Sequence, residues 1–345
     1  MLCLAACNTD TETHAGPSRE LAKFEPPDGN VLVFVGQDNE SVGGNGRWSD
    51  GYVEAFGVPA GITHYVYFTE GKENPFGGKF DIGSVDGLNS ETEWAAGPMC
   101  MRCYLESARL QGTIAHLSIS MEHDDEPLVA AGDYDHNIDE LVAFVEEFAD
   151  VPFLIRIGYE FDGEWNSYEP EAFIAAWRRI VDALRAAGLT NFATVLASYR
   201  LDIPDELWET YWPGDDYVDW LGYSYWEGGT YSDLALDFAR RTGKPIFMAE
   251  STPRGLFLDQ ESGELWDAWF ADYFKHIEDN ADVIKAISYI NANWDAQAMW
   301  QGRDWGNSRL QDNEVLATKW RETMSQPPYV HTVDGTYELI RFNAR

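Results

Sequence analysis

Two glutamates each follow an apolar run of the kind that forms a buried strand. Glu160 comes shortly after the run PFLIRIG at residues 152–158, and Glu250 directly follows PIFMA at residues 245–249. Hydrolysis of a glycosidic bond needs such a pair, because one carboxyl protonates the leaving oxygen while the other attacks the anomeric carbon. At a separation of about 5 Å no water fits between the two groups, and a covalent glycosyl-enzyme forms with retention of configuration. The sequence therefore predicts a retaining glycoside hydrolase with Glu160 as general acid/base and Glu250 as nucleophile.

Arg156 lies four residues before Glu160, on the same predicted strand. Alternation along a strand points positions an even number apart to one face. A guanidinium there would hold the nucleophile ionised, and the like charges of the two glutamates would raise the pKa of the acid. The alternative is that both glutamates are surface carboxylates among 59 acidic residues. Their positions after two separate strands favour the functional interpretation.

The segment after residue 155 is similar to the acid/base motif of glycoside hydrolase family 26, which has R-x-x-x-E followed by a D/N-G-x-W loop. The residues that match this motif are Arg156, Glu160, Gly163 and Trp165. The resemblance implies a β-mannanase-related enzyme of the large (β/α)8 retaining glycosidase clan, and it carries the two catalytic roles to Glu160 and Glu250. The family's typical His before the acid/base is Tyr159 here, so the chain resembles a divergent member and the sugar stays open.

Eight apolar runs with strand character recur along the chain, most of them followed by a run of helical periodicity. The predicted strands span residues 31–36, 63–68, 113–121, 152–158, 191–197, 217–223, 245–249 and 283–290. The predicted helices span 51–56, part of 91–110, 138–148, 169–187, 204–211, a segment ending at 242, 262–280 and 313–324. This pattern predicts an α/β protein with one (β/α)8 TIM-barrel domain over residues 26–345. An open doubly wound sheet is the alternative, but its glycine-rich nucleotide turn is missing. Residues 336–342 have strand character.

Further side chains for sugar binding are expected after other strands, since active sites of such barrels lie at the C-terminal strand ends. We expect His123 or Asp124 to bind sugar hydroxyls and Tyr225 to orient the nucleophile or stack on a sugar. Trp294 is expected to form the floor under the sugar at the cleavage site, because aromatic rings stack on flat apolar faces. The full set of predicted binding residues is Arg156, Tyr159, Trp165, His123, Asp124, Tyr225, Trp294, Gln37 and Asn39. Packing aromatics and ordinary polar loops are the alternative, and we expect neither cofactor nor metal.

The net charge of −35 argues against nucleic acid and anionic lipid as partners. It also argues against a polyanionic substrate, unless basic residues are concentrated in the cleft. The expected partner of this monomer is a polysaccharide or oligosaccharide: first an endo-cleaved β-mannan, xylan or glucan, then a marine galactan or fucan. Two other classes stay open. A non-catalytic glycan-binding surface lipoprotein would need neither glutamate, and a barrel lyase or isomerase would need a Lys, His or metal base.

The four cysteines fall into two groups. Leu4-Ala5-Ala6-Cys7 resembles the lipobox of bacterial lipoproteins, which implies a lipid anchor at Cys7. We therefore expect residues 1–25 to be a signal remnant and flexible tether of a secreted or outer-surface bacterial protein, periplasmic or extracellular; a chance match is the alternative. Cys100 and Cys103 form a single C-x-x-C, which is half a zinc site at best, so a local disulfide is expected.

Overall fold

Eight parallel strands close into a barrel in the computed structural model, which describes residues 19–73, 78–93, 95–122, 124–227, 233–260 and 264–343. Each strand pairs with the next along the chain, and the last pairs with the first, so the predicted (β/α)8 barrel is confirmed. The barrel strands are β1 (Val31–Gly36), β2 (Gly61–Tyr67), β5 (Ile114–Ser120), β6 (Phe153–Ile157), β7 (Phe192–Ser198), β8 (Trp220–Tyr225), β9 (Ile246–Ser251) and β10 (Ile284–Ile290). A short strand, β11 (Tyr329–Val330), pairs with β1 outside the ring.

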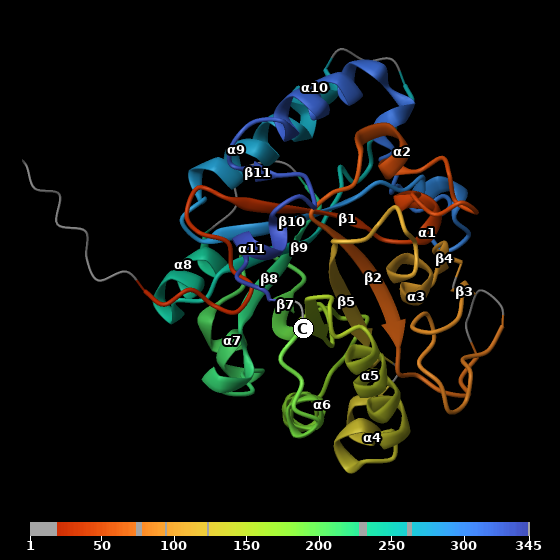
Figure 1. Ribbon diagram of the computed structural model, residues 1–345, viewed down its shortest axis with the longest axis vertical. Helices are drawn as coiled ribbons and strands as arrows, with labels where there is room; N and C mark the ends of the chain where they lie inside the picture. Colours follow the sequence, from red (N-terminus) through yellow and green to blue (C-terminus); the bar gives the residue numbers. More distant parts are fainter. Residues whose placement is uncertain are drawn as a thin grey trace, which may run out of the picture.

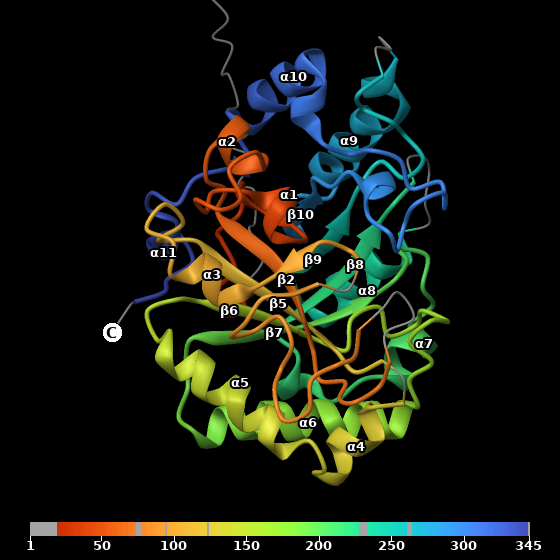
Figure 2. The ribbon, with the colours of Figure 1, turned by 90° about the vertical axis from the view of Figure 1, so that its right-hand side faces the viewer.

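Helices surround this barrel (Figure 1). They are α1 (Asn39–Val42), α2 (Tyr52–Phe56), α3 (Met101–Leu105), α4 (Glu126–Ala131), α5 (Asp135–Glu147), α6 (Pro170–Ala186), α7 (Asp205–Thr210), α8 (Leu234–Thr242), α9 (Ala271–Asp279), α10 (Glu314–Met324) and α11 (Thr336–Leu339), with a π-helical turn η2 (Trp266–Phe270) before α9. In Figure 2, α4, α5 and α6 lie together along one edge. None of the described helices is long and apolar enough to cross a membrane.

The helix α6 shows why these segments form helices. It begins at Pro170, whose fixed φ suits the first helical position, and it buries Phe173, Trp177, Ile180 and Leu184 on one face. The chain leaves the helix through Gly188, whose φ of 74° is in the left-handed region that favours glycine. An apolar stripe of this kind packs against the barrel and leaves the charged face in water.

The segments that cover the barrel confirm two expectations and correct a third. Residues 91–110 are partly helical as expected, with α3 preceded by a two-stranded hairpin of β3 (Thr92–Glu93) and β4 (Pro98–Met99). The predicted disulfide between Cys100 and Cys103 is confirmed there. The strand predicted at 336–342 is wrong: this segment is α11, whose first turn forms when Leu339 N donates to the Gly335 carbonyl.

Residues before position 26, which were predicted to be part of a flexible tether, pack against the barrel. Phe24 and Glu25 are buried, and Trp220 Nε1 donates to the Lys23 carbonyl at 2.8 Å. Phe24 also meets the ring of Phe342 edge-on. Residues 19–25 therefore belong to the folded body, because the bottom of the barrel offers them an apolar surface. Residues 1–18, with Cys7, lie outside the described part, so the lipid anchor stays a prediction.

The barrel interior changes from apolar to polar toward the C-terminal strand ends. Ile114 and Leu154 lie at the lower level among buried apolar side chains. One level higher, the hydroxyl of Thr63 is hydrogen-bonded to His116 Nδ1 at 3.0 Å and to Ser288 Oγ at 2.7 Å. Layered side chains fill such barrels. Here the layers lead upward into the polar groups of the site.

Candidate active site

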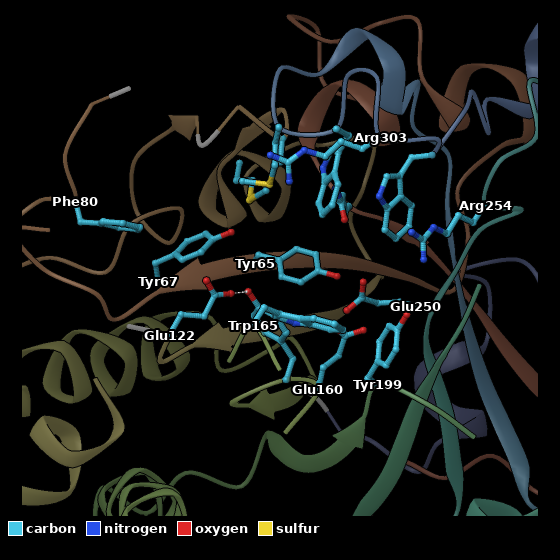
Figure 3. A pocket seen from close by; sticks show the side chains of 17 residues that line it. Tyr65, Tyr67, Phe80, Glu122, Glu160, Trp165, Tyr199, Glu250, Arg254 and Arg303 are labelled. Atoms are coloured by element: carbon cyan, nitrogen blue, oxygen red, sulfur yellow. Dashed lines mark hydrogen bonds between the residues drawn. The ribbon is translucent and has the colours of Figure 1, made fainter. Parts of the chain in front are cut away.

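Glu160 and Glu250 open into one pocket at the C-terminal ends of the strands, with a volume of about 440 Å³. Glu250 lies within β9, whereas Glu160 lies three residues beyond the end of β6. Figure 3 shows both carboxyl groups pointing into the same space. The sequence prediction that the two glutamates face a common gap therefore agrees with their placement.

Ser224 lies beside both glutamates. It is the parallel partner of Glu250 in the β8–β9 register, directly after an irregularity that follows Tyr223. Its hydroxyl donates a 2.6 Å hydrogen bond to Glu160 Oε1. Ser224 therefore holds the carboxyl of Glu160 from a position on β8 that is next to Glu250 on β9.

Arg156 forms a buried ion pair with Glu250, at 2.6 Å between Nη2 and Oε1. The β2–β5–β6 register aligns Tyr65, Ser118 and Arg156 on one level of the barrel. The guanidinium donates to Ser118 Oγ at 3.0 Å and to Tyr65 Oη at 3.2 Å, and the Arg156 side chain is fully buried. An opposite charge at this distance favours the ionised carboxylate, as a nucleophile requires.

Glu160 is in the opposite electrostatic situation. Burial, together with the nearby charge of Glu250, raises the pKa of Glu160 well above its usual value. The Ser224 hydrogen bond and the Arg156 cation oppose this increase but do not cancel it. A glutamate with a raised pKa beside one that is ion-paired with an arginine is the arrangement that a general acid and a nucleophile need.

Aromatic side chains form much of the pocket wall. Trp165 is 51% exposed, and its ring meets Tyr199 edge-on at 4.6 Å between centroids. Across from it, Trp300 and Trp305 pack against each other at 4.9 Å. The complete lining is Gln37, Tyr65, Tyr67, Phe80, Ala96, Met99, Glu122, Tyr159, Glu160, Trp165, Tyr199, Glu250, Arg254, Met299, Trp300, Arg303 and Trp305. Exposed rings around two carboxyl groups suit a chain of sugar rings.

Four further residues of the predicted set are close to Glu160 and Glu250. Gln37, Tyr159 and Trp165 line the pocket, and Arg156 lies beneath it. Tyr159, which replaces the His of the resembling motif, donates its hydroxyl hydrogen to Glu122 Oε1. The structure thus groups these four side chains with the two glutamates.

The structure does not bring the other predicted residues to the pocket lining. Trp294 is only 1% exposed and donates from Nε1 to Ser308 Oγ at 2.9 Å, so it supports the neighbouring ring of Trp300 from behind. Tyr225 is buried against Trp269, Tyr273 and His276. Both residues therefore pack inside the protein, as the alternative interpretation of these aromatics expects.

Two of the predicted polar residues also lie away from the pocket lining. Asn39 is fully buried in α1, where its amide donates to the Cys100 carbonyl at 3.5 Å. Asp124 is an exposed residue that does not line the pocket. His123 lies outside the described residues. The acidic residue of this segment that reaches the pocket is Glu122, which lies two residues beyond the end of β5.

Several pocket residues were not predicted, although the sequence contains a signal for some of them. Tyr65 and Tyr67 alternate along β2 with apolar residues, which marks an inward face at the strand end. Ser224 had no such signal, because the irregular β8–β9 register decides its position. Among the described residues, no group of three His, Cys, Asp or Glu side chains could hold a metal ion.

Comparisons with known proteins find relatives by sequence and solved structures with a similar fold. The chain is 33% identical to a β-1,3-xylanase of a Vibrio species, over 92% of this chain and 69% of that protein. It is also 33% identical to a β-1,3-xylanase of an Alcaligenes species, over 92% of this chain and 68% of that protein. No protein-family model matches.

Solved structures share the fold at lower identity. The glycoside hydrolase family 26 protein GH26C of a Muricauda species has a TM-score of 0.62 and 14% identity, covering 92% of this chain and 91% of that one. A family 26 β-mannanase from Bacteroides ovatus has a TM-score of 0.58 and 17% identity, covering 92% and 94%. These likenesses show a common barrel architecture.

Proposed function

Because the chain belongs to a divergent, family 26-like group of (β/α)8 glycoside hydrolases that includes two β-1,3-xylanases, we propose that it is a retaining endo-β-1,3-xylanase. In this proposal Glu160 is the general acid/base and Glu250 is the nucleophile. The observation that carries the proposal is the buried Arg156–Glu250 ion pair beside a glutamate whose pKa burial raises.

The proposed reaction has two steps. First, Glu250 attacks the anomeric carbon and the bond to the leaving oxygen breaks, while Glu160 gives that oxygen its proton. Glu250 loses its charge when it bonds to the sugar, and Glu160 gains one when it loses the proton. Then Glu160 takes a proton from water, whose oxygen attacks the anomeric carbon and displaces Glu250. The pair carries one negative charge throughout, and Arg156 compensates it.

The xylan part of the proposal rests on the two relatives named as β-1,3-xylanases. The structural neighbours named as mannanases share only the fold at this identity, so mannan becomes a comparison substrate. A polysaccharide is too large to enter a cell, so this substrate agrees with the prediction that the protein is secreted or displayed on the surface.

The test measures reducing-end release by the purified chain on β-1,3-xylan, β-1,4-xylan, β-1,4-mannan and β-1,3-glucan. We expect activity on β-1,3-xylan and a series of short oligosaccharides, as endo cleavage gives. Glu250→Ala should reduce turnover by roughly 10⁴-fold or more, as loss of other hydrolase nucleophiles does. Glu314→Ala, at an exposed carboxylate of α10, is the matched control and should stay near the wild-type rate.

Azide separates the two roles on an aryl glycoside, whose good leaving group needs no acid. With Glu160→Ala, azide should attack the glycosyl-enzyme and give the β-glycosyl azide; with Glu250→Ala, it should replace the nucleophile and give the α-azide. Near-normal hydrolysis by Glu250→Ala rejects the assignment. Binding of xylan by a wild-type protein that releases no reducing ends would instead support a non-catalytic glycan-binding protein.

A further inference from the structure

Two arginines line the pocket of a chain that carries only 24 basic residues against 59 acidic ones. Arg254 and Arg303 are exposed, and Figure 3 shows Arg254 at the Glu250 end of the pocket, away from Glu122. A neutral xylan offers no charge for these cations to bind. Their position in a protein with a net charge of −35 therefore needs an explanation.

Arg254 is held in place by the wall itself. It lies four residues after Glu250, and its backbone N donates to the Trp226 carbonyl at 3.3 Å. Its guanidinium lies over the ring of Trp305, 4.6 Å from the centroid. Trp305 is fixed in turn by Trp226, with ring centroids 5.3 Å apart. A guanidinium has five N–H donors, so the contact with the Trp305 ring and the hydrogen bond with Tyr199 leave other donors for a ligand.

Among the described residues, no ion pair compensates the charge of Arg254. Other exposed arginines form such pairs, as Arg179 does with Asp135 at 2.6 Å and Arg240 with Asp282 at 2.8 Å. Arg254 forms none with the carboxylates that the structure describes. The charge of Glu250 close by is already balanced by Arg156. This end of the pocket is therefore the part of the cleft where a negative group would be attracted.

We propose that Arg254 binds an anionic substituent on a sugar next to the cleavage site. The substituent is a carboxylate or a sulfate ester, both of which match the planar donors of a guanidinium. The enzyme then prefers an acidic xylan to a neutral one. This inference rests on the proposed function and deepens it by naming the substrate class.

The experiment compares KM for an unsubstituted β-1,3-xylo-oligosaccharide with KM for the same oligosaccharide carrying one glucuronosyl group or one sulfate ester. For the wild type we expect a KM about tenfold lower for at least one acidic form, since a charge-assisted hydrogen bond contributes about that factor. The two acidic forms show whether carboxylate or sulfate is the ligand. The preference should weaken as NaCl increases from about 0.05 to 0.5 M, because salt screens exposed charges.

The ratio of the two KM values is the readout for the variants. Arg254→Gln should bring this ratio close to one, and Arg254→Lys should keep part of the preference as a point charge. Arg321→Gln, at an exposed arginine of α10 outside the pocket, is the control and should leave the ratio unchanged.

Two outcomes overturn the inference: equal KM values in the wild type, or a preference that Arg254→Gln leaves intact. Hydrolysis of the neutral oligosaccharide without any acidic preference would refute the anion site and leave the proposed function standing. If the wild type hydrolyses none of the three, the proposed function fails. Calorimetric titration of the unaltered protein with the same oligosaccharides then decides the anion site separately, because tighter binding of an acidic form supports it and equal binding refutes it.

Discussion

Replacement of Arg156 by Met should destabilise the fold mainly through the charge that it leaves on Glu250. The Arg156 side chain is fully buried and that of Glu250 is 8% exposed, with 2.6 Å between the paired atoms. Charge centres about 4 Å apart attract each other by about 4 kcal/mol at an effective dielectric constant of about 20. Removal of one partner from a buried pair costs about 3–5 kcal/mol in other proteins. We therefore expect Arg156→Met to lower the free energy of unfolding by about 4 kcal/mol at pH 7.

The assay is urea unfolding of the wild type, Arg156→Met, Glu250→Gln and the double variant. If the stranded charge causes the loss, the double variant should recover most of it, because it buries a neutral amide where the single variant buries a carboxylate.

Equal instability of Arg156→Met and the double variant would refute this reasoning. The cost would then come from the lost volume of the side chain and from its hydrogen bonds to Ser118 and Tyr65. Arg156→Lys is the matched control. It keeps the charge but loses the forked donors, so it should cost less than Met.

Three other substitutions test separate parts of the site. Ser224→Ala removes a hydrogen bond that lowers the pKa of Glu160, so the alkaline limb of the kcat/KM profile should move to higher pH; an unchanged limb contradicts this. Burial raises the pKa of Asp38 to about 6. Folded Asp38 thus keeps its proton to higher pH than unfolded Asp38, and its contribution to stability should fall by about 3 kcal/mol as pH rises through this interval. Asp38→Asn should lack that fall in thermal unfolding at pH 4 and 7. Trp165→Ala should raise KM for long substrates by roughly three- to tenfold with little change in melting temperature, because the ring is 51% exposed; an unchanged KM would place sugar stacking elsewhere.

The barrel could be predicted because its strands are continuous apolar runs in the sequence. The run at 31–36 matches β1 residue for residue, since a strand buried on both faces needs apolar side chains at every position. The prediction at 217–223 differs most from β8. There Asp215–Tyr217 forms a 3-10 turn, and the strand begins only at Trp220. Apolar character alone does not distinguish such a turn from the strand that follows.

The sequence alone could not show which aromatic residues of the loops are buried and which line the pocket. Trp294 and Trp305 come from the same Asn- and Asp-rich segment, yet Trp294 is buried and Trp305 lines the pocket. The difference depends on partners far away in the chain, such as Thr252, whose hydroxyl accepts a 3.2 Å hydrogen bond from Trp294 Nε1. Arg254 was missed for the same reason, because its role depends on the ring of Trp305.

The position of Glu160 depends on a backbone conformation that its neighbours maintain. Glu160 has a φ of 49°, which is costly for a residue with a Cβ and persists only where the surroundings fix it. Asn166 Nδ2 donates to the carbonyls of Tyr159 and Glu160 at 2.8 and 2.9 Å, and Gly163 N donates to the same Glu160 carbonyl at 2.8 Å. The glycine, tryptophan and asparagine of this loop thus have different tasks. Gly163 and Asn166 hold the turn that carries Glu160 beyond the end of β6, and Trp165 extends into the pocket. The short motif therefore combines the residues that fix the backbone of Glu160 with an aromatic ring of the pocket wall.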